Sequence, residues 1–235
     1  MAKHIAVFGS PGSGKSVFCA ALAKEVVRQK KRTVIVSGDI VVPMLPFFCG
    51  DSDTTGLGRL CAGDITPLSL SETVKIINQY PDIGVIGCQF DDYPISITSE
   101  QLLSISKWLD DMVDVVIWDG LAEMNCVINQ TVLPIADTRV CIVTADTKGI
   151  LYFENYRHMI RDTGKCILLE GMAKPYTTYE EMSLRVGGFY GRLNYGRDIE
   201  RICNDGNVFN IDKVCHESYR MEAEKIIGLA LKKEE

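Results

Sequence analysis

One short stretch of the sequence carries residues whose types and spacing suit phosphate chemistry. Residues 9–16 read G-S-P-G-S-G-K-S, which fits the pattern G-x-x-x-x-G-K-[ST] at every position. In that pattern the glycines let the backbone turn so that successive N–H groups point at an anion. The lysine then reaches the β- and γ-phosphates, and the hydroxyl binds Mg²⁺. The stretch therefore predicts a P-loop that binds a nucleoside triphosphate.

The surroundings of this stretch favour a P-loop over a glycine-rich turn without a ligand. Residues 4–8 (H-I-A-V-F) predict a buried strand, and residues 17–23 (V-F-C-A-A-L-A) predict a helix whose N-terminal dipole attracts phosphate. We predict a catalytic role for Lys15 at the phosphates and a Mg²⁺-binding role for Ser16. The predicted nucleotide-binding residues of the loop are Gly9, Ser10, Pro11, Gly12, Ser13, Gly14, Lys15, Ser16 and Val17.

Two carboxylates follow predicted strands and could complete a Mg²⁺ site. The apolar run V-V-I-W-D-G at 115–120 contains Asp119, which we interpret as the Walker B carboxylate that binds Mg²⁺ directly or through water. An ordinary polar strand end is the structural alternative for this residue. Asp39 follows the second strand, and it fits either a catalytic, Mg²⁺-binding carboxylate or the cap of a turn.

Strand-like and helix-like segments alternate along the chain. Further buried strands are predicted at 33–36, 83–87, 113–118, 138–144 and 165–169, and helices at 69–79, 98–110, 125–133, 149–161 and 179–186. This order predicts an α/β fold with a doubly wound, mostly parallel sheet flanked by helices, and with ligands at the carboxyl ends of its strands. A length of 235 residues suits a single domain spanning 1–235.

Composition narrows the expected partners and compartment. The formal net charge of −6 and the pI near 5.2 argue against a chain that coats nucleic acid. No apolar run approaches the ~20 residues of a membrane span and no signal peptide precedes the first strand, so we expect a cytoplasmic protein. Nine cysteines without C-x-x-C spacing predict buried, reduced thiols. His4, His158 and His216 lack ligand spacing, so Mg²⁺ is the one metal expected.

These motifs together resemble the ParA/MinD group of P-loop ATPases. The resemblance rests on the P-loop, on Asp39 after the second strand and on V-V-I-W-D-G at 115–120. The segment 83–160, with I-A-D-T-R-V at 135–140, is most similar to the ATPase domain of the CpaE/TadZ branch, which helps localise pilus-assembly or secretion machinery. The resemblance implies ATP and Mg²⁺ as cofactors, a homodimer, and a protein partner from a localisation, secretion or partition apparatus.

At three positions the sequence departs from that group. Members carry a second, signature lysine where this chain has Ser10, and a first carboxylate after the second strand where it has Ser37. A serine supplies neither a cation across a dimer nor a carboxylate that orients water, so we expect slow hydrolysis. Glu170 stands where members carry an Asn near the adenine. We count it among the nucleotide-binding residues; a Glu can accept a hydrogen bond from the adenine amino group but lacks the amide's donor, so the sequence leaves the base preference open.

Three functions remain open on the sequence alone. The first is an ATP-dependent positioning or assembly switch with weak ATP hydrolysis. The alternatives are a non-hydrolysing ATP-binding module and a small-molecule kinase or ligase, for which we find no Arg-rich lid. For the switch, the missing signature lysine implies a dimer that depends on apolar and polar surface contacts more than on ATP.

The C-terminal segment 217–235 predicts a helix. Its apolar residues do not form a clean stripe, and its acidic residues match its basic ones in number. Helices that bind anionic lipid are rich in Lys and Arg, so we expect this helix to pack on its own sheet. Aromatic and basic residues between 176 and 197 fit either an interaction face or edge packing.

Overall fold

The computed structural model describes residues 1–39, 43–48, 56–89, 96–162, 166–173, 179–214 and 217–232. Its strands are β1 (Lys3–Gly9), β2 (Thr33–Ser37), β3 (Lys75–Ile77), β4 (Tyr80–Ile86), β5 (Val115–Asp119), β6 (Thr138–Thr144), β7 (Cys166–Ala173) and β8 (Gly191–Asn194). Its helices are α1 (Lys15–Arg28), α2 (Met44–Phe48), α3 (Leu57–Ala62), α4 (Pro67–Thr73), α5 (Ser99–Met112), α6 (Val127–Ile135), α7 (Thr147–Asp162), α8 (Tyr179–Val186), α9 (Arg197–Asn204), the 3₁₀ helix η1 (Val208–Val214) and α10 (Glu217–Ala230).

The strands form one eight-stranded sheet with the order β3-β4-β2-β5-β1-β6-β7-β8. Neighbouring strands are parallel except β3 and β4, which are antiparallel. The strand order changes direction around β1, because β5 and β2 lie on one side of it and β6 and β7 on the other. Parallel α/β sheets bind ligands beyond the carboxyl ends of their strands at such a point.

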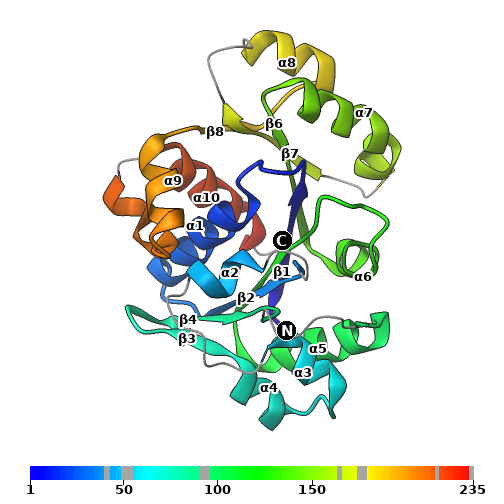
Figure 1. Ribbon diagram of the computed structural model, residues 1–235, viewed down its shortest axis with the longest axis vertical. Helices are drawn as coiled ribbons and strands as arrows, with labels where there is room; N and C mark the ends of the chain where they lie inside the picture. Colours follow the sequence, from blue (N-terminus) through cyan, green and yellow to red (C-terminus); the bar gives the residue numbers. More distant parts are fainter. Residues whose placement is uncertain are drawn as a thin grey trace.

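Helices cover both faces of the sheet (Figure 1). α1, α9 and α10 pack on one face, and α5, α6 and α7 pack on the other. Successive side chains of a strand enter different cores: Val7 and Ile117 lie in the core under α1, whereas Ala6 and Trp118 lie in the core under α5. The alternation follows from the two-residue period of a strand. This architecture confirms the predicted doubly wound, mostly parallel fold.

The register of β5 brings three strand ends together. Asp119 is paired with Val7 of β1 and with Ser37 of β2, and all three residues are buried. Since β1, β2 and β5 are parallel, their carboxyl ends meet at one edge of the sheet. The P-loop after β1 and the residues after β2 therefore lie at the same edge as Asp119.

The predicted helix at 69–79 is wrong in its second half. The helix α4 ends at Thr73, and the residues after it form β3, which pairs antiparallel with β4. Ile76 and Ile77 are β-branched, and such side chains lose rotamer freedom in a helix but pack well on a strand. The local preference for a strand therefore outweighs the apolar spacing that suggested one long helix.

Capping explains where two other predicted helices begin. Thr98 starts α5 as a capping box: its hydroxyl accepts from the Gln101 N–H at 3.3 Å, and Gln101 Oε1 accepts from the Thr98 N–H at 2.9 Å. The helix predicted at 125–133 is observed as α6, which begins later because Cys126 Sγ caps it by accepting from the Asn129 N–H at 3.4 Å. The short elements β8, α9 and η1 had no prediction, since periodicity cannot be read over so few residues.

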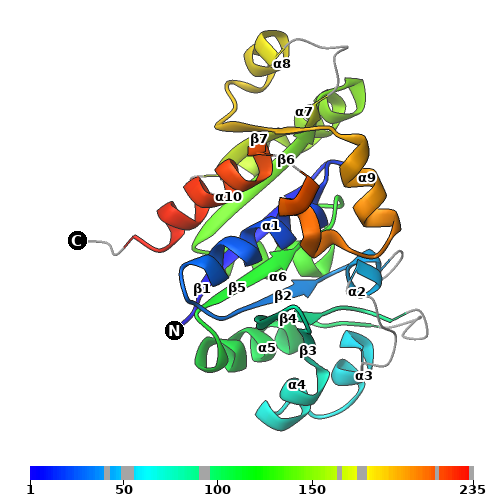
Figure 2. The same ribbon diagram turned by 90° about the vertical axis from the view of Figure 1, so that its left-hand side faces the viewer.

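The C-terminal helix packs against α1 and β8 (Figure 2). Its buried residues join the core that α1 shares with the sheet; they are Tyr219, Glu222, Ala223, Ile226, Ile227 and Ala230. This packing confirms the prediction that the helix covers its own sheet. Within the described ranges, no helix has the length and apolar character that crossing a bilayer requires.

The cysteines that the structure describes differ in burial. Cys88 and Cys141 are buried, as their apolar surroundings predict, whereas the prediction is wrong for Cys126, Cys166 and Cys203, which are only partly buried. The described residues do not include Cys49, Cys215, Tyr176 and His216.

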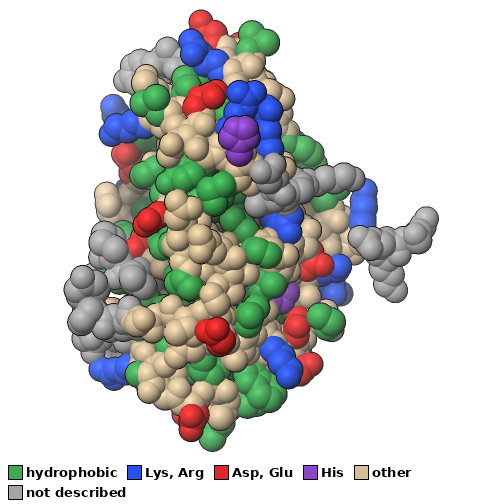
Figure 3. Space-filling view, turned by 90° about the vertical axis from the view of Figure 1, so that its right-hand side faces the viewer, with side chains coloured by type: hydrophobic (Ala, Val, Ile, Leu, Met, Phe, Trp, Pro, Cys, Tyr) green, Lys and Arg blue, Asp and Glu red, His purple; other side chains and the backbone are tan. Residues whose placement is uncertain are grey.

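The surface charge shows no single basic area on the face drawn in Figure 3, where basic and acidic side chains are interspersed.

Candidate nucleotide-binding site

The P-loop joins β1 to α1 and turns on three glycines. Gly9, Gly12 and Gly14 have φ values of 144°, 69° and 89°, a range that favours glycine. Space also excludes a side chain at Gly9, because a Cβ there would overlap the backbone of Ile142 on β6. Gly14 is the N-cap residue of α1, so the free N–H groups of the first helical turn adjoin the loop. This geometry suits an anion cradle.

Ser10 is fully buried, and its side chain is bound to β6. Its hydroxyl lies 3.2 Å from Thr144 Oγ1 and accepts from the Thr144 N–H at 2.8 Å, while its own N–H donates to the Ile142 carbonyl at 2.9 Å. Ser10 therefore holds the P-loop against β6. Both the hydroxyl and the backbone N–H of Ser10 are thus already bonded within the protein, and contact between Ser10 and a nucleotide stays a prediction.

Lys15 lies over the loop that precedes it. Its Nζ donates to the carbonyl oxygens of Ser10 at 3.2 Å and of Gly9 at 3.4 Å. Burial lowers the pKa of Lys15, and the carboxylates of Asp119 and Asp39 oppose that effect by favouring the charged ammonium. A cation and two carboxylates are thus close together at the carboxyl edge of the sheet.

Asp119 is buried at the end of β5, with 3% of its surface exposed. Burial raises the pKa of its carboxyl from 3.8 to about 6, and the neighbouring Ser16 and Lys15 oppose the rise by stabilising the anion. The Ser37 hydroxyl donates to Asp119 Oδ2 at 3.5 Å, whereas Oδ1 has no hydrogen-bond partner among the described residues. A buried acceptor without a partner destabilises the folded protein unless a hydrogen-bond donor or a cation binds to it.

Asp39 lies beside the same cluster, directly after β2. Its N–H donates to Ser37 Oγ at 3.4 Å, and the Gly38 N–H donates to the Asp119 carbonyl at 3.0 Å. The negative charge of Asp39 raises the pKa of both Asp119 and Lys15, so its carboxylate lies within electrostatic reach of both. The structure therefore brings together the predicted catalytic and metal-binding residues.

The residues at this edge fit a Mg²⁺ ion. Ser16, Asp39 and Asp119 offer one hydroxyl and two carboxylates, the oxygen donors that Mg²⁺ prefers, and Asp119 Oδ1 is a buried acceptor without a partner in the described chain. Mg²⁺ takes its other ligands from water and substrate phosphates, so a closed protein cage is not required. Bound there, the ion would neutralise phosphate charge. Across the described ranges, no group of three or more His, Cys, Asp and Glu side chains could hold a metal.

The buried carboxyl of Asp119 predicts a pH-dependent stability of the ligand-free protein. Its folded-state pKa of about 6 lies above the ordinary value of 3.8, so the unfolded chain loses this proton first as the pH rises. The protonated carboxyl of Asp119 therefore contributes fully to the free energy of unfolding below pH 4. This contribution is lost once the pH has passed 6, and the free energy of unfolding falls by an amount on the order of 2–3 kcal/mol. Urea denaturation between pH 4 and 8 measures it.

Two variants isolate this contribution. Asp119→Asn should remove that fall in stability and make the ligand-free protein more stable than the wild type at pH 8. Asp114→Asn is the matched control, because Asp114 is a more exposed aspartate whose pKa is lowered by a hydrogen bond from the Arg32 N–H. An unchanged fall in Asp119→Asn would contradict the raised pKa of Asp119.

Glu170 lies inside β7 and contacts β8. It is fully buried, and its Oε2 is 2.9 Å from Nε of Arg192, the residue paired with it in the sheet. Burial raises the pKa of Glu170, and the Arg192 guanidinium opposes the rise. The next residue, Gly171, is the one that approaches the loop, since a Cβ there would lie 2.5 Å from the Ser13 carbonyl. Contact between Glu170 and a base therefore stays a prediction.

Two residues that the sequence did not indicate lie against the P-loop. Tyr219 of α10 is fully buried, and its hydroxyl is 3.6 Å from Met172 Sδ. A Cβ placed on Gly14 would lie 3.1 Å from that hydroxyl and 3.6 Å from that sulfur. Met172 has a φ of 50°, which is uncommon outside glycine. A tyrosine in a C-terminal helix reads as an ordinary core residue, so no sequence signal could have identified this contact.

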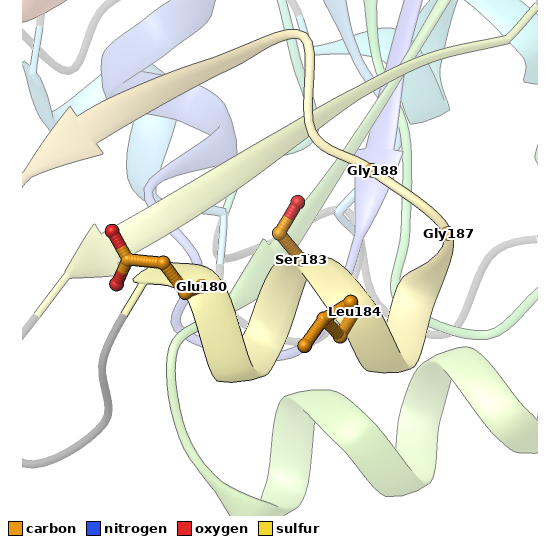
Figure 4. A pocket seen from close by; sticks show the side chains of 5 residues that line it. All are labelled: Glu180, Ser183, Leu184, Gly187 and Gly188. Atoms are coloured by element: carbon orange, nitrogen blue, oxygen red, sulfur yellow. The ribbon is translucent and has the colours of Figure 1, made fainter.

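A separate hollow of about 620 Å³ adjoins α8 (Figure 4). Its lining residues are Glu180, Ser183, Leu184, Gly187 and Gly188. The N–H groups of Gly187 and Gly188 both donate to the Ser183 carbonyl, and these two hydrogen bonds terminate α8. None of the predicted site residues lines this hollow, so we do not assign the nucleotide to it.

Sequence comparison matches only the first part of the chain. The family model described as the central domain of the helicase HerA matches residues 1–37, which hold β1, the P-loop, α1 and β2. No curated protein matches the chain. The family match is thus confined to the segment that contains the P-loop.

Comparison of structures covers the whole chain. A ParA family ATPase from Chlorobium tepidum TLS superposes with a TM-score of 0.78 at 16% identity, covering 99% of this chain and 100% of that one. The MinD cell division protein of Aquifex aeolicus gives 0.78 at 12% identity, covering 100% of both chains. The septum site-determining protein MinD complexed with Mg-ADP from Pyrococcus horikoshii OT3 gives 0.78 at 14% identity, covering 99% and 100%. The chain therefore has the fold of the ParA and MinD ATPases.

Proposed function

We propose that this chain binds ATP with Mg²⁺ at its P-loop, in a single P-loop ATPase domain spanning 1–235, and acts as a nucleotide-dependent positioning or assembly switch with slow hydrolysis. The observation that carries the proposal is the convergence of Lys15, Ser16, Asp39 and Asp119 at one edge of the sheet, beside the glycine-rich loop. The cation suits the β- and γ-phosphates, and the oxygen donors suit Mg²⁺.

The solved structures of the same fold support the choice of cofactor and of partner class. One is a MinD complexed with Mg-ADP, another is an McdA in complex with ATP, and a third is a MinC:MinD cell division complex. By analogy we propose ATP, Mg²⁺, a homodimer and a protein partner for this chain, which we expect in the cytoplasm. A localisation apparatus of the CpaE/TadZ type is the finer form of the proposal, and it rests on the sequence resemblance.

Slow hydrolysis is proposed because two groups that would act on water or on the phosphates are missing. Ser37 supplies a hydroxyl where a carboxylate would orient water, and that hydroxyl is bound to Asp119. Ser10 supplies no cation, and its hydroxyl is bound to Thr144. Binding needs neither group, so ATP affinity and turnover should separate in this chain.

A single-turnover experiment separates the three candidate functions. ATP labelled in its γ-phosphate is bound to excess protein with Mg²⁺, with and without candidate acceptors, and the label is followed over hours. Slow release of phosphate to water supports the switch. Transfer to an acceptor would mean a kinase or ligase, and no turnover would mean that ATP is a structural ligand.

The variant Ser37→Asp should accelerate hydrolysis of bound ATP. It adds a carboxylate at the position where a general base or a water-orienting group would act, and such groups contribute about 10²–10⁴-fold. We expect a gain of only roughly tenfold to 100-fold. The new carboxyl group would be buried beside Asp119, which raises the pKa of the new group and keeps part of it in the inactive, protonated form. The measurement is the single-turnover rate constant at pH 8.

The control for this variant keeps the shape and removes the charge. Ser37→Asn places an amide of the same size at the end of β2, and its rate should stay at the wild-type value. We leave Ser10 unchanged in both variants, since its hydrogen bonds with Thr144 hold the loop. Equal rates for Ser37→Asp and Ser37→Asn would show that this position does not limit hydrolysis.

A further inference from the structure

Three side chains join the P-loop to the N-terminal end of α7. Ser10 Oγ donates to Thr144 Oγ1 at 3.2 Å, and Thr144 Oγ1 donates to Asp146 Oδ1 at 2.8 Å. The same Asp146 oxygen accepts from the Gly149 N–H at 2.9 Å, so the aspartate caps the first turn of α7. We call Ser10, Thr144 and Asp146 the hydroxyl chain.

The hydrogen bonds of the hydroxyl chain have a fixed direction. Each hydroxyl has one proton and a carboxylate only accepts, so the Thr144 proton points to Asp146 and the Ser10 proton points to Thr144. Ser10 Oγ also accepts from the Thr144 N–H at 2.8 Å. Both hydroxyl residues are buried, so loss of one bond leaves a polar group without a partner away from water.

The hydroxyl chain connects helices on opposite faces of the sheet. The helix α1, which follows the P-loop, packs in one core, and α7 packs in the other (Figure 1). The start of α7 lies directly on the end of β6, because a Cβ on Gly149 would overlap the Thr144 carbonyl. The P-loop is held to the same strand, since the Ser10 N–H donates to the Ile142 carbonyl at 2.9 Å. Movement at one end of this unit therefore affects the other.

Nucleotide binding would change the contacts of Ser10. In the ligand-free protein, Lys15 Nζ donates to the Ser10 carbonyl at 3.2 Å and to the Gly9 carbonyl at 3.4 Å. A phosphate in the loop draws Lys15 away from these carbonyl groups. The bonds of Ser10 with β6 then hold this part of the loop without the lysine. Two states with different contacts at Ser10 are what a ligand-linked change requires.

We propose that the hydroxyl chain couples the P-loop to the start of α7, so that nucleotide binding orders the first turn of α7. Coupling of this kind is reciprocal, so an intact cap on α7 tightens nucleotide binding by the same factor. Thr144 and Asp146 are thus positioning residues that act through Ser10. The inference deepens the proposed function, on which it rests for the identity of the ligand, by naming the helix that responds to the nucleotide.

Amide hydrogen exchange of the full chain, resolved by residue with NMR, tests the coupling without nucleotide. Ser10→Ala should accelerate exchange of the Gly149 amide by roughly threefold to tenfold, because the cap loses its support from the P-loop. Thr144→Val, which keeps the shape of the side chain, should have the same effect, whereas Thr144→Ser keeps the hydroxyl and should match the wild type. The Gln101 amide, capped by Thr98 at the start of α5, is the internal control and should not change.

The same measurement with Mg²⁺ and ATP tests the response to the ligand. Exchange of the Gly149 amide should slow by roughly threefold to tenfold in the wild type. It should slow less than twofold in Thr144→Val at saturating ATP, because the link to the P-loop is then missing.

Equilibrium dialysis of ATP with Mg²⁺ tests the coupling in the reverse direction. Asp146→Ala should raise the dissociation constant by roughly threefold to tenfold, and Asp146→Asn should restore most of the affinity because its amide oxygen still accepts. In the Thr144→Val background Asp146→Ala should have no further effect, since the aspartate acts through the threonine. Thr131→Val is the matched control: it removes a buried hydroxyl of α6, 2.7 Å from the Val127 carbonyl, and should leave the affinity unchanged.

The two kinds of measurement separate this inference from the proposed function. A wild type without saturable ATP binding would refute the proposed function, and exchange in the ligand-free variants would then decide the coupling. Unchanged Gly149 exchange in Ser10→Ala, unchanged affinity in Asp146→Ala, or additive losses in the double variant would each overturn the proposal. Thermal melting shows which variants fold, and Ser10→Ala replaces Thr144→Val in the double variant if the latter does not.

Discussion

Replacing Lys15 with alanine should abolish measurable ATP binding. The Nζ of Lys15 now donates to two carbonyl groups of the P-loop, and in the bound protein it would donate instead to the β- and γ-phosphates. Hydrogen bonds to charged groups contribute about 1.5–3 kcal/mol each. Loss of two such bonds weakens binding by about 100-fold or more. Titration calorimetry with Mg²⁺ and ATP measures the effect.

The control for this experiment is Lys3→Ala. Lys3 begins β1, at the opposite end of the strand from the P-loop, and pairs with Asp137 at 3.1 Å on the surface. Its removal subtracts the same charge from the protein and should leave ATP affinity unchanged. Both variants should melt near the wild-type temperature. Wild-type affinity in Lys15→Ala would refute the P-loop assignment, whereas equal losses in both variants would indicate only a change in net charge.

Replacing Gly9 with alanine should unfold the protein or destabilise it by about 4 kcal/mol or more, in the range of the most damaging single substitutions. A Cβ at this position overlaps the backbone carbonyl of Ile142 and lies 2.7 Å from its backbone nitrogen. β1 and β6 are paired at this point, so neither backbone can move without breaking the centre of the sheet. Urea denaturation of the ligand-free protein measures the loss.

Gly12→Ala separates the effect of space from the effect of backbone conformation. Gly12 also has a positive φ, of 69°, but a Cβ there meets nothing within 4 Å. Alanine at this site should therefore cost only the penalty of a left-handed residue, about 1–2 kcal/mol. Equal losses at Gly9 and Gly12 would contradict the close approach of β1 to β6.

The sequence could predict the site wherever function depends on local spacing. The P-loop needs a strand, three glycines and a helix in immediate succession, and all of these lie within a few residues of Lys15. Asp119 was predictable because it ends a buried parallel strand, where a carboxylate is unfavourable unless it binds a partner. The order of strands and helices then predicted the sheet, since parallel strands require covered faces and crossover helices.

The contacts that the sequence could not predict join residues far apart in the chain. The bond between Ser10 and Thr144 spans two adjacent strands, and the approach of Tyr219 to Gly14 depends on how α10 packs on α1. Serine and tyrosine carry no sequence signal for such roles. Glu170 illustrates the same limit, because the resemblance suggested a base contact whereas tertiary packing supplies Arg192 as its neighbour.

Equilibrium dialysis of radiolabelled ATP against the unmodified chain, with Mg²⁺ or with EDTA, tests the central claim most directly. The cluster of Lys15, Ser16, Asp39 and Asp119 predicts saturable binding of one ATP per chain with Mg²⁺. It also predicts binding weaker by about tenfold or more in EDTA, since the carboxylates then face the phosphates without a cation between them. Absence of saturable binding, or equal affinity with Mg²⁺ and with EDTA, would contradict the assignment of this edge of the sheet as a Mg²⁺-dependent ATP site.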